Sequence, residues 1–327
     1  MTLRNVLVVS ILLLLSTTSP ADSQNLKVGY PSIGGAQTPL FVAKESGAFR
    51  RQGLNVETIF IAGGNRVVQA MIAGDIQFAQ VSQAPAISAS LAGADLVFIA
   101  NLYPTLVYSL WVAPEIKRPA DLKGKKLGVT SFGSVIDFGT RLFLKKFNLI
   151  PDRDVALIQV GGQTNAVAAL AAKAIQGCLL NPSASIEAKK LGAQELFDLR
   201  GLGVDYAFVG VAVSRAYWTR NPDIVERFTK AYVEGISIAK QDPRLTTRVL
   251  EKYTKATDQR ELAETYRVFV TNALLDKPYT TDQGIQANLD GLGPKLKAAQ
   301  NAKPQTFYDN QIIDKLEKSG YIKSLYQ

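Results

Sequence analysis

Two copies of a short glycine-serine pattern are the residues of this sequence whose types and spacing best suit chemistry. Residues 29–34 and 128–133 both have the form G-x-x-S-x-G, and each copy follows a short apolar segment typical of a β-strand. When such a loop leads into a helix, its free backbone N–H groups favour an anionic or strongly polar ligand. A plain turn that needs glycine explains either loop equally well by itself. The duplication favours ligand binding, because both loops would then serve one site.

The composition gives covalent catalysis and metal binding little support. The 327 residues include no histidine and one cysteine, Cys178, so Ser-His-Asp sets, His-ligated zinc and internal disulfides are excluded. Cys178 lies in an apolar strand pattern, where an inert buried thiol is expected. The glycine patterns also lack the spacing of dinucleotide and P-loop sites. We therefore expect no enzyme activity, no cofactor and no metal ion.

One carboxylate, Asp137, falls in the first turn of the helix expected after the second glycine loop. A carboxylate at that position ordinarily interacts with the helix dipole. It could alternatively pair with an amine of a ligand. The sequence leaves both roles open.

The net charge of +9, from 37 Lys+Arg and 28 Asp+Glu, does not indicate a nucleic-acid partner. The basic residues form small clusters, such as residues 123–126 and 189–190, with carboxylates between them. The sequence contains no basic arm and no platform of alternating basic and aromatic residues. A mildly cationic surface can still steer anionic small molecules toward the protein.

The first 23 residues have the pattern of a secretory signal peptide. Arg4 precedes an apolar run from Val6 to Leu15, and Ala21-Asp22-Ser23 offers small residues for cleavage. The apolar run is too short to span a bilayer, and no cysteine at the cleavage point could carry a lipid. Export without disulfides favours the periplasm. We expect a soluble periplasmic monomer after cleavage.

An internal duplication extends well beyond the glycine-serine loops. Gly63-Gly64 recurs as Gly161-Gly162 at an offset of 98, and Ile76-Gln77 recurs as Ile175-Gln176 at an offset of 99. The shared order and nearly constant offset are harder to obtain by chance than any single match. Because this period is too long for a solenoid, it predicts two related halves.

Each half alternates strands with helices, which predicts a mostly parallel sheet covered on both faces. The expected strands are 26–30, 54–61, 76–81, 126–130, 155–160 and 176–180, and the expected helices are 39–51, 66–73, 135–147 and 165–174. Beyond residue 210 the pattern changes to long helices at 223–240, 243–252 and 260–275. Ligands of open α/β sheets bind at the carboxyl ends of the strands, where both glycine loops fall.

Several stretches resemble the solute-binding proteins for nitrate, sulfonate, taurine and thiamine precursors that serve ABC importers. Residues 119–129, with the sequence PADLKGKKLGV, are the most specific stretch, and residues 39–47, 73–76 and 319–326 extend the resemblance over nearly the whole mature chain. The resemblance implies an α/β type II periplasmic binding protein fold, in which two Rossmann-like lobes flank a hinge and a ligand cleft.

The resemblance also implies the division of the chain. Residues 24–110 plus 209–327 would form lobe 1, and residues 111–208 would form lobe 2. The chain would cross between the lobes near 108–113 and 206–213. The implied ligand-binding residues are Ser32, Gly34, Gln37, Gly63, Gly64, Asn65, Ser82, Gln83, Tyr103, Phe132, Gly133, Ser134, Asn181 and Tyr206.

The function implied by the resemblance is periplasmic capture of a small solute and its delivery to a transmembrane permease with a cytoplasmic ATPase. The cationic balance and the helix N-termini favour an organic anion such as a sulfonate or carboxylate. The aromatic candidates leave room for a pyrimidine or thiamine-precursor heterocycle. A fold-related biosynthetic enzyme is disfavoured by the absence of histidine, and a binding protein that reports to a sensor is a further alternative.

Overall fold

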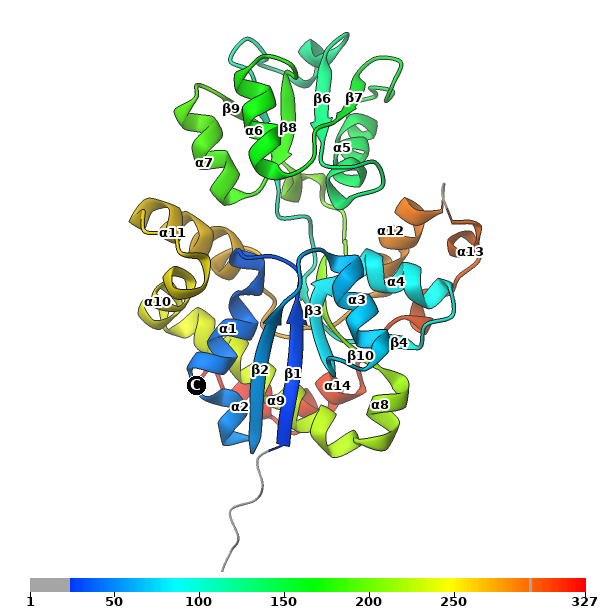
Figure 1. Cartoon of the computed structure of the whole chain (residues 1–327), viewed down its shortest axis with the longest axis vertical. Coiled ribbons are helices and arrows are strands. Elements are labelled where there is room, and N and C mark those ends of the chain that lie inside the picture. The colour runs from blue at the N-terminus through cyan, green and yellow to red at the C-terminus, as the bar shows by residue number, and fades with distance from the viewer. Residues whose placement is uncertain (1–23, 294–295) are drawn as a thin grey trace, which may run out of the picture.

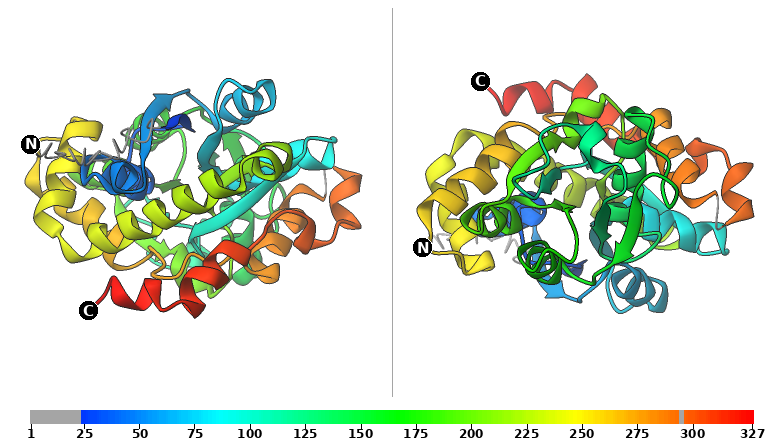
Figure 2. Two further views of the ribbon diagram at one scale, coloured as in Figure 1. Left: turned by 90° about the horizontal axis from the view of Figure 1, so that it is seen from below. Right: turned by 90° about the horizontal axis from the view of Figure 1, so that it is seen from above.

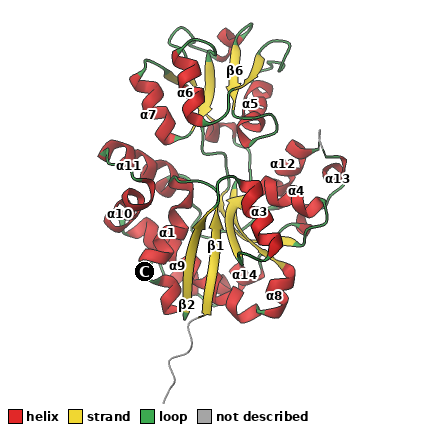
Figure 3. Ribbon diagram, in the orientation of Figure 1, coloured by secondary structure: helices red, strands yellow, loops and turns green. Residues whose placement is uncertain are grey.

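A computed structural model describes residues 24–293 and 296–327 of the chain. The expected signal peptide, residues 1–23, lies outside the described residues. Two lobes, each built on a five-stranded sheet, lie one above the other along the long axis of the molecule (Figure 1). Helices flank the sheet of each lobe (Figure 3).

The sheet of lobe 1 has the order β2-β1-β3-β10-β4. Its strands are β1 (Gln24–Tyr30), β2 (Leu54–Phe60), β3 (Phe78–Ser82), β4 (Leu96–Tyr103) and β10 (Val209–Ser214). β1 runs parallel to β2 and β3, whereas β10 is antiparallel to both β3 and β4. The strand that returns from the other lobe is therefore the exception to the predicted parallel sheet.

The sheet of lobe 2 repeats this order as β7-β6-β8-β5-β9. Its strands are β5 (Ser109–Val112), β6 (Lys126–Val129), β7 (Ala156–Gln159), β8 (Gly177–Leu180) and β9 (Gln194–Asp198). β6 takes the place of β1, and the antiparallel strand β5 takes the place of β10. The two halves predicted from the sequence are thus present as two sheets of equivalent topology.

The helices follow the predicted alternation with two differences. The first repeat contains η1 (Gly35–Gln37), α1 (Thr38–Glu45), α2 (Ala48–Arg51), α3 (Gly64–Ala73) and α4 (Gln83–Leu91), and the second contains η2 (Pro119–Leu122), α5 (Val135–Lys146), α6 (Gln163–Ala171), α7 (Pro182–Lys190) and η3 (Leu199–Leu202). The helix expected at 39–51 is two helices, because Gly47 adopts a left-handed φ of 79° between them. The helix expected at 260–275 ends at Thr271, before its expected end.

The remaining helices pack on lobe 1, and the one over Gln259–Thr265 also contacts α7 of lobe 2. They are α8 (Arg215–Arg220), α9 (Pro222–Gln241), α10 (Pro243–Thr254), α11 (Gln259–Thr265), the π-helix η4 (Tyr266–Thr271), α12 (Asp282–Leu292), α13 (Lys297–Gln300), η5 (Pro304–Thr306), α14 (Gln311–Lys318) and α15 (Tyr321–Ser324). α11 passes into the π-turn η4 and stops at Thr271. The C-terminal helices run along one side of lobe 1 (Figure 2). Across the described ranges, none of these helices is both long and apolar enough to cross a membrane.

The duplication is visible in the packing of the equivalent strands β1 and β6. An ideal Cβ on Gly29 of β1 would lie 2.4 Å from Cδ1 of Ile76, and one on Gly128 of β6 would lie 2.6 Å from Cδ1 of Ile175. The glycines are equivalent at an offset of 99, and so are the isoleucines. In each lobe a glycine in this strand therefore leaves room for the equivalent isoleucine.

A side-chain hydrogen bond is also repeated between the lobes. The backbone N–H of Lys27 donates to Oε1 of Gln77 at 2.9 Å, and that of Lys126 donates to Oε1 of Gln176 at 3.1 Å. Both glutamines precede the third strand of their sheet. The repeated contact shows that the offset of 99 residues is a structural equivalence.

The chain crosses between the sheets slightly earlier than expected. It leaves lobe 1 after Tyr103 and begins pairing in lobe 2 at Ser109; it leaves β9 at Asp198 and re-enters lobe 1 at Val209. The apolar segment expected to be the first crossing is mostly the buried strand β5 itself. The lobe boundary placed after residue 110 would cut this strand, so we propose a boundary before Ser109.

Candidate ligand-binding site

The carboxyl ends of the central strands of both lobes face the space between the lobes. Ser82, at the end of β3, pairs with Val209, and Leu180, at the end of β8, pairs with Ser109. Val209 and Ser109 are the first strand residues after the two crossings, so these strand ends lie beside the hinge. Loops that follow the strands of each lobe are thereby directed toward the other lobe (Figure 1), as expected for ligand sites of open α/β sheets.

A cavity of about 650 Å³ lies between the lobes. Lobe 2 contributes the start of α5, lobe 1 contributes the first turn of α4 and the end of α12, and the second crossing contributes Tyr206. This volume is in the range of small-molecule sites. Four of the predicted site residues line it, namely Phe132, Gly133, Ser134 and Tyr206.

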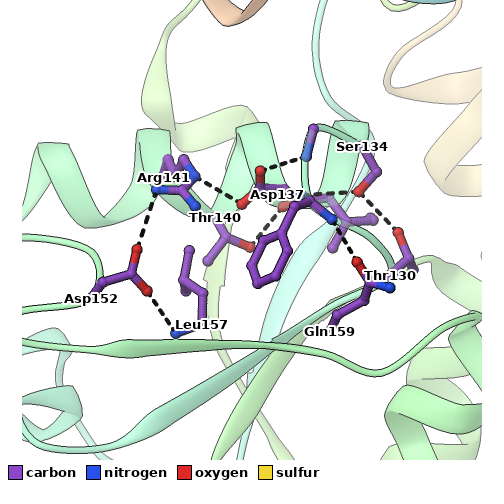
Figure 4. A network of polar contacts seen from close by, with 11 residues as sticks. Thr130, Ser134, Asp137, Thr140, Arg141, Asp152, Leu157 and Gln159 are labelled. Carbon is purple, nitrogen blue, oxygen red and sulfur yellow. Dashed lines mark hydrogen bonds and ion pairs between the residues drawn. The ribbon is translucent and has the colours of Figure 1, made fainter. Parts of the chain in front are cut away.

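The second glycine loop is fixed by the first turn of α5 (Figure 4). Ser134 is the N-cap of this helix, and its Oγ accepts the N–H of Asp137 at 3.3 Å. The N–H of Gly133 donates to Oδ2 of Asp137 at 2.7 Å. Gly133 has a φ of 78°, a conformation that favours glycine. The loop and the helix therefore hold one another through a buried carboxylate.

A further hydrogen bond pairs the backbone N–H of Phe132, the residue at the tip of this loop. The N–H of Phe132 donates to Oε1 of Gln159 on β7 at 3.2 Å, and the phenyl ring is 48% exposed. A backbone donor that an anion could have bound is thus already paired, whereas the ring is available to a ligand.

An arginine joins two carboxylates at the edge of the cavity (Figure 4). Nε of Arg141 lies 2.8 Å from Oδ1 of Asp137, which is buried, and Nη1 lies 3.9 Å from Oδ2 of the exposed Asp152. All three residues line the cavity. The guanidinium is therefore neutralised within the protein.

Phe138 of α5 brings the two lobes into contact beside the cavity. Its ring centroid lies 5.0 Å from that of Tyr206, and an ideal Cβ on Gly291 of α12 would lie only 2.6 Å from the phenyl ring. The ring of a lobe 2 residue thus rests on the backbone of a lobe 1 helix. A larger residue at position 291 would push the lobes apart.

The predicted residues of the first glycine loop lie outside this cavity. Gln37 is buried, and its Nε2 lies 3.4 Å from Oγ of Ser32. Gly34 has an extended φ of 167°, so its torsion does not require glycine. None of these three residues lines the cavity.

Two predicted residues point into the core of lobe 1. The hydroxyl of Tyr103 donates to the carbonyl of Ala36 at 3.2 Å, and Nε2 of Gln83 donates to Oδ1 of Asn101 at 3.0 Å. Both side chains are fully buried, and burial raises the pKa of Tyr103, which keeps its hydroxyl a donor. Tyr103 holds the first glycine loop from below instead of forming a wall of the cleft.

The other predicted residues lie at the starts of helices. Gly63, Gly64 and Asn65 begin α3 on the exposed or half-exposed surface, and Ser82 precedes α4 without capping it by its side chain. Asn181 caps α7, and its Oδ1 accepts the N–H of Ala184 at 2.9 Å. None of these five residues lines the 650 Å³ cavity.

The sequence model of the NMT1/THI5-like family matches residues 35–245, which is more than half of the chain. The chain belongs to this family. The match begins in the loop after β1, contains the whole of lobe 2 and ends in α10, so it includes both lobes of the cleft.

The chain is also similar to proteins that are described as binding proteins. A protein of Brucella abortus (strain 2308), assigned only provisionally as a binding protein, is 27% identical over 282 residues, covering 85% of this chain and 84% of that protein. The periplasmic aliphatic sulphonate binding protein SsuA of Escherichia coli superposes with a TM-score of 0.73 at 19% identity, covering 88% of this chain and 92% of SsuA. The periplasmic nitrate-binding protein NrtA of Synechocystis PCC 6803 superposes with a TM-score of 0.69 at 13% identity, covering 94% of this chain and 91% of NrtA. The fold is the two-lobed periplasmic binding protein fold predicted from the sequence.

Several residues of the cavity were not among the predicted site residues of this family member. Phe138, Arg141, Asn288, Asp290 and Gly291 line it. Phe138 and Arg141 follow Ser134 by four and seven residues on α5, a helical spacing that the sequence could have shown. The other three lie on α12, more than 140 residues away, and only the packing of the lobes brings them to the site.

Proposed function

We propose that this NMT1/THI5-like protein is the solute-binding component of an ABC importer, and that it acts without catalysis. In this proposal residues 1–23 direct export to the periplasm and are removed. The monomer then captures a small solute between its lobes and delivers it to a permease driven by a cytoplasmic ATPase. The observation that carries the proposal is the cavity lined by both lobes beside the hinge. The family assignment and the periplasmic relatives support it.

Ligand capture would work by closure around the two crossing segments. These segments are bound to one another, since the N–H of Tyr206 donates to the carbonyl of Pro104 at 2.9 Å and that of Phe208 donates to the carbonyl of Tyr103 at 3.1 Å. A solute that contacts both lobes stabilises the closed state by its differential affinity for that state. Phe132 and Ser134 would contact it from lobe 2, and Asn288 from lobe 1.

The ligand class is the finer part of the proposal. The sequence favours an organic anion, but the N–H groups of Phe132 and Gly133 already donate to side chains of the protein. The heterocycle alternative agrees better with the aromatic residues of the cavity, Phe132, Phe138 and Tyr206.

Thermal unfolding of residues 24–327 tests this function. The protein is refolded to remove bound solute and mixed with sulfonates, carboxylates, nitrate, amino acids, pyrimidines and amines. A ligand at 100 times its dissociation constant should raise the free energy of unfolding by about 2.7 kcal/mol, which moves the midpoint by several degrees. Small-angle scattering with that ligand should show compaction.

A matched pair of variants tests whether the ligand that shifts the unfolding midpoint binds in the cavity. Phe132→Ala should weaken the response, whereas Phe60→Ala should not, because Phe60 has a similar exposure of 47% but lies at the end of β2 outside the cavity. Equal responses of both variants, or a bound ligand that produces no compaction, would argue against capture at this site.

A further inference from the structure

The cavity between the lobes carries the opposite charge to the whole protein. Its lining includes three carboxylates, those of Asp137, Asp152 and Asp290, and one guanidinium, that of Arg141. The formal charge of the lining is therefore 1 − 3 = −2, although the chain carries +9. Arg141 is already within reach of two of these carboxylates, so it is not free to bind an anionic ligand.

The helix N-terminus at the cavity is also occupied. Anions commonly bind at such positions through free backbone N–H groups and the helix dipole. At the start of α5 the carboxylate of Asp137 takes this place and accepts the N–H of Gly133 at 2.7 Å (Figure 4). The protein thereby supplies its own anion, which disfavours a second one from the ligand.

The buried amide of Asn288 indicates which kind of ligand group would suit the cavity. Its side chain is 1% exposed, and its Nδ2 donates to the carbonyls of Ala207 at 2.9 Å and Gly284 at 3.0 Å. These two acceptors identify the nitrogen of the amide. Within the described part of the chain, Oδ1 has no hydrogen-bond partner. A buried acceptor without a donor costs free energy. A ligand with N–H donors is therefore favoured over one that offers only acceptors.

The walls of the cavity suit the body of an organic cation. Phe132 exposes almost half of its surface, and Phe138 and Tyr206 lie beside one another on the same cavity. The face of an aromatic ring attracts a cation within about 6 Å of its centroid. The described residues contain no group of three or more His, Cys, Asp or Glu that could hold a metal ion, so a bare metal cation is the poorer fit.

We propose that the cavity binds a small organic cation, a protonated amine or amidinium attached to a planar or apolar body. The charged nitrogen lies against the carboxylate of Asp290, and the body packs on Phe132. This inference rests on the proposed function of the same cleft and names the chemical class of its solute. Asp290 is the main specificity residue, because it is exposed on α12. The amide of Gln286 donates to its Oδ1 at 2.8 Å, but within the described ranges no basic side chain forms an ion pair with it.

A reporter thiol measures the charge of the cavity without any ligand. Phe132→Cys is reacted with a trimethylammonium and a sulfonate form of the same methanethiosulfonate reagent. Ile72→Cys, on the exposed C-terminal end of α3, is the reference. Native Cys178 does not interfere, because it is buried and its pKa is raised to about 12 by burial. The cation-to-anion rate ratio at the Phe132→Cys thiol should exceed the reference ratio about fivefold or more at low salt.

Charge removal completes this experiment. Asp290→Asn in the Phe132→Cys background should lower the rate ratio about threefold, whereas Asp75→Asn, in the turn before β3 at the opposite end of lobe 1, should leave it unchanged. A ratio at or below the reference, or one that Asp290→Asn does not alter, would overturn the proposed cation preference.

Direct binding uses three probes of the same shape. Benzylamine should bind at least about tenfold more tightly than benzoate at pH 7, with benzyl alcohol between them, and Asp290→Asn should weaken only benzylamine, about fivefold. Tighter binding of benzoate would overturn the inference but leave solute capture intact. Failure of the cleft to bind or close on any solute of the wider panel would instead argue against the proposed function, while the thiol rates would still report the charge of the cavity.

Discussion

The two glycine-serine loops occupy equivalent places in the two lobes, yet different chemistry fixes them. At the offset of 99 residues Thr38 of lobe 1 corresponds to Asp137 of lobe 2. The hydroxyl of Thr38 donates to the carbonyl of Gly35 at 2.6 Å, whereas the carboxylate of Asp137 accepts the N–H of Gly133 and pairs with Arg141. One loop is held by neutral groups and the other by a charged network.

The first loop is supported from within lobe 1. Tyr103 and Gln80 both donate to the carbonyl of Ala36, at 3.2 and 2.5 Å, and the hydroxyl of Tyr232 donates to Gln80. These side chains are buried beneath the loop. The duplicated framework therefore keeps the position of each loop, while the charged side chains that fix a loop occur only at the start of α5 in lobe 2.

The largest expected effect tests whether the strands β1 and β6 are equivalent. Gly29→Val and Gly128→Val should each destabilise the protein by about 2 kcal/mol or more, because a Cβ would overlap the side chain of Ile76 or Ile175. Chemical denaturation followed by circular dichroism measures the loss. A cost below about 0.5 kcal/mol at either site would show that the packing there is not tight.

A double-mutant cycle separates this overlap from the loss of glycine itself. Ile76→Ala should offset part of the cost of Gly29→Val, and Ile175→Ala should do the same for Gly128→Val. If the paired changes were simply additive in both lobes, the isoleucines would not be the cause. A coupling in one lobe alone would mean that the repeat has diverged in its core.

A smaller effect should distinguish the two loops. Asp137→Ala should cost about 2 kcal/mol, because Gly133 loses a charge-assisted, partly buried hydrogen bond to a buried carboxylate. Thr38→Val should cost less than about 1 kcal/mol, because the carbonyl of Gly35 still accepts the N–H of residue 38. Urea denaturation of the two variants measures the difference. Equal losses would contradict the contrast between a neutral and a charged loop.

Much of this architecture could be predicted from the sequence because local pattern and repeat agree. The alternation of strands and helices placed β1, β6, α3 and α5 close to their observed bounds. The antiparallel strands β5 and β10 could not be predicted, since their partners depend on where the chain crosses between lobes. The break of the first long helix at Gly47 was also missed, although its left-handed φ is typical of glycine at a helix end.

The site was harder to predict than the fold. Phe132 lies within the repeated pattern and Ser134 directly after it, and both line the cavity. Tyr103 belongs instead to the core, because an aromatic residue at a strand end can turn to either face. Asn288 and Asp290 lie on a helix outside the repeat, so no spacing in the sequence connects them with Phe132. Long-range packing supplies that part of the site.

The side-chain hydrogen bond that is repeated in the two lobes allows a further comparison of their stability. Gln77→Ala and Gln176→Ala each remove a side-chain acceptor from the N–H of Lys27 or Lys126. Both contacts are exposed to water, which can replace the lost acceptor, so each change should cost about 0.5–1 kcal/mol. Denaturation midpoints should fall by the same amount within error. A clearly larger loss in one lobe would show that the contact differs in its surroundings.

The smallest expected effect is a change in stability that depends on pH, and it compares Asp154 of lobe 2 with its equivalent in lobe 1. Asp154 of lobe 2 corresponds to Asn55 of lobe 1, and a hydrogen bond from Arg153 and one from the N–H of Ile150 hold the pKa of its carboxyl below the ordinary value. Since the folded pKa lies below the unfolded one, this stabilisation is complete above pH of about 4 and disappears as the pH falls through the folded value. Asp154→Asn should therefore lower the urea midpoint at pH 7 and have a diminishing effect as the pH approaches about 2, below the ordinary carboxyl range. Asn55→Asp should show no such trend, because Asn55 interacts with the neutral Asn25. A midpoint difference for Asp154→Asn that stays constant with pH would mean that the charge of this carboxylate does not stabilise lobe 2.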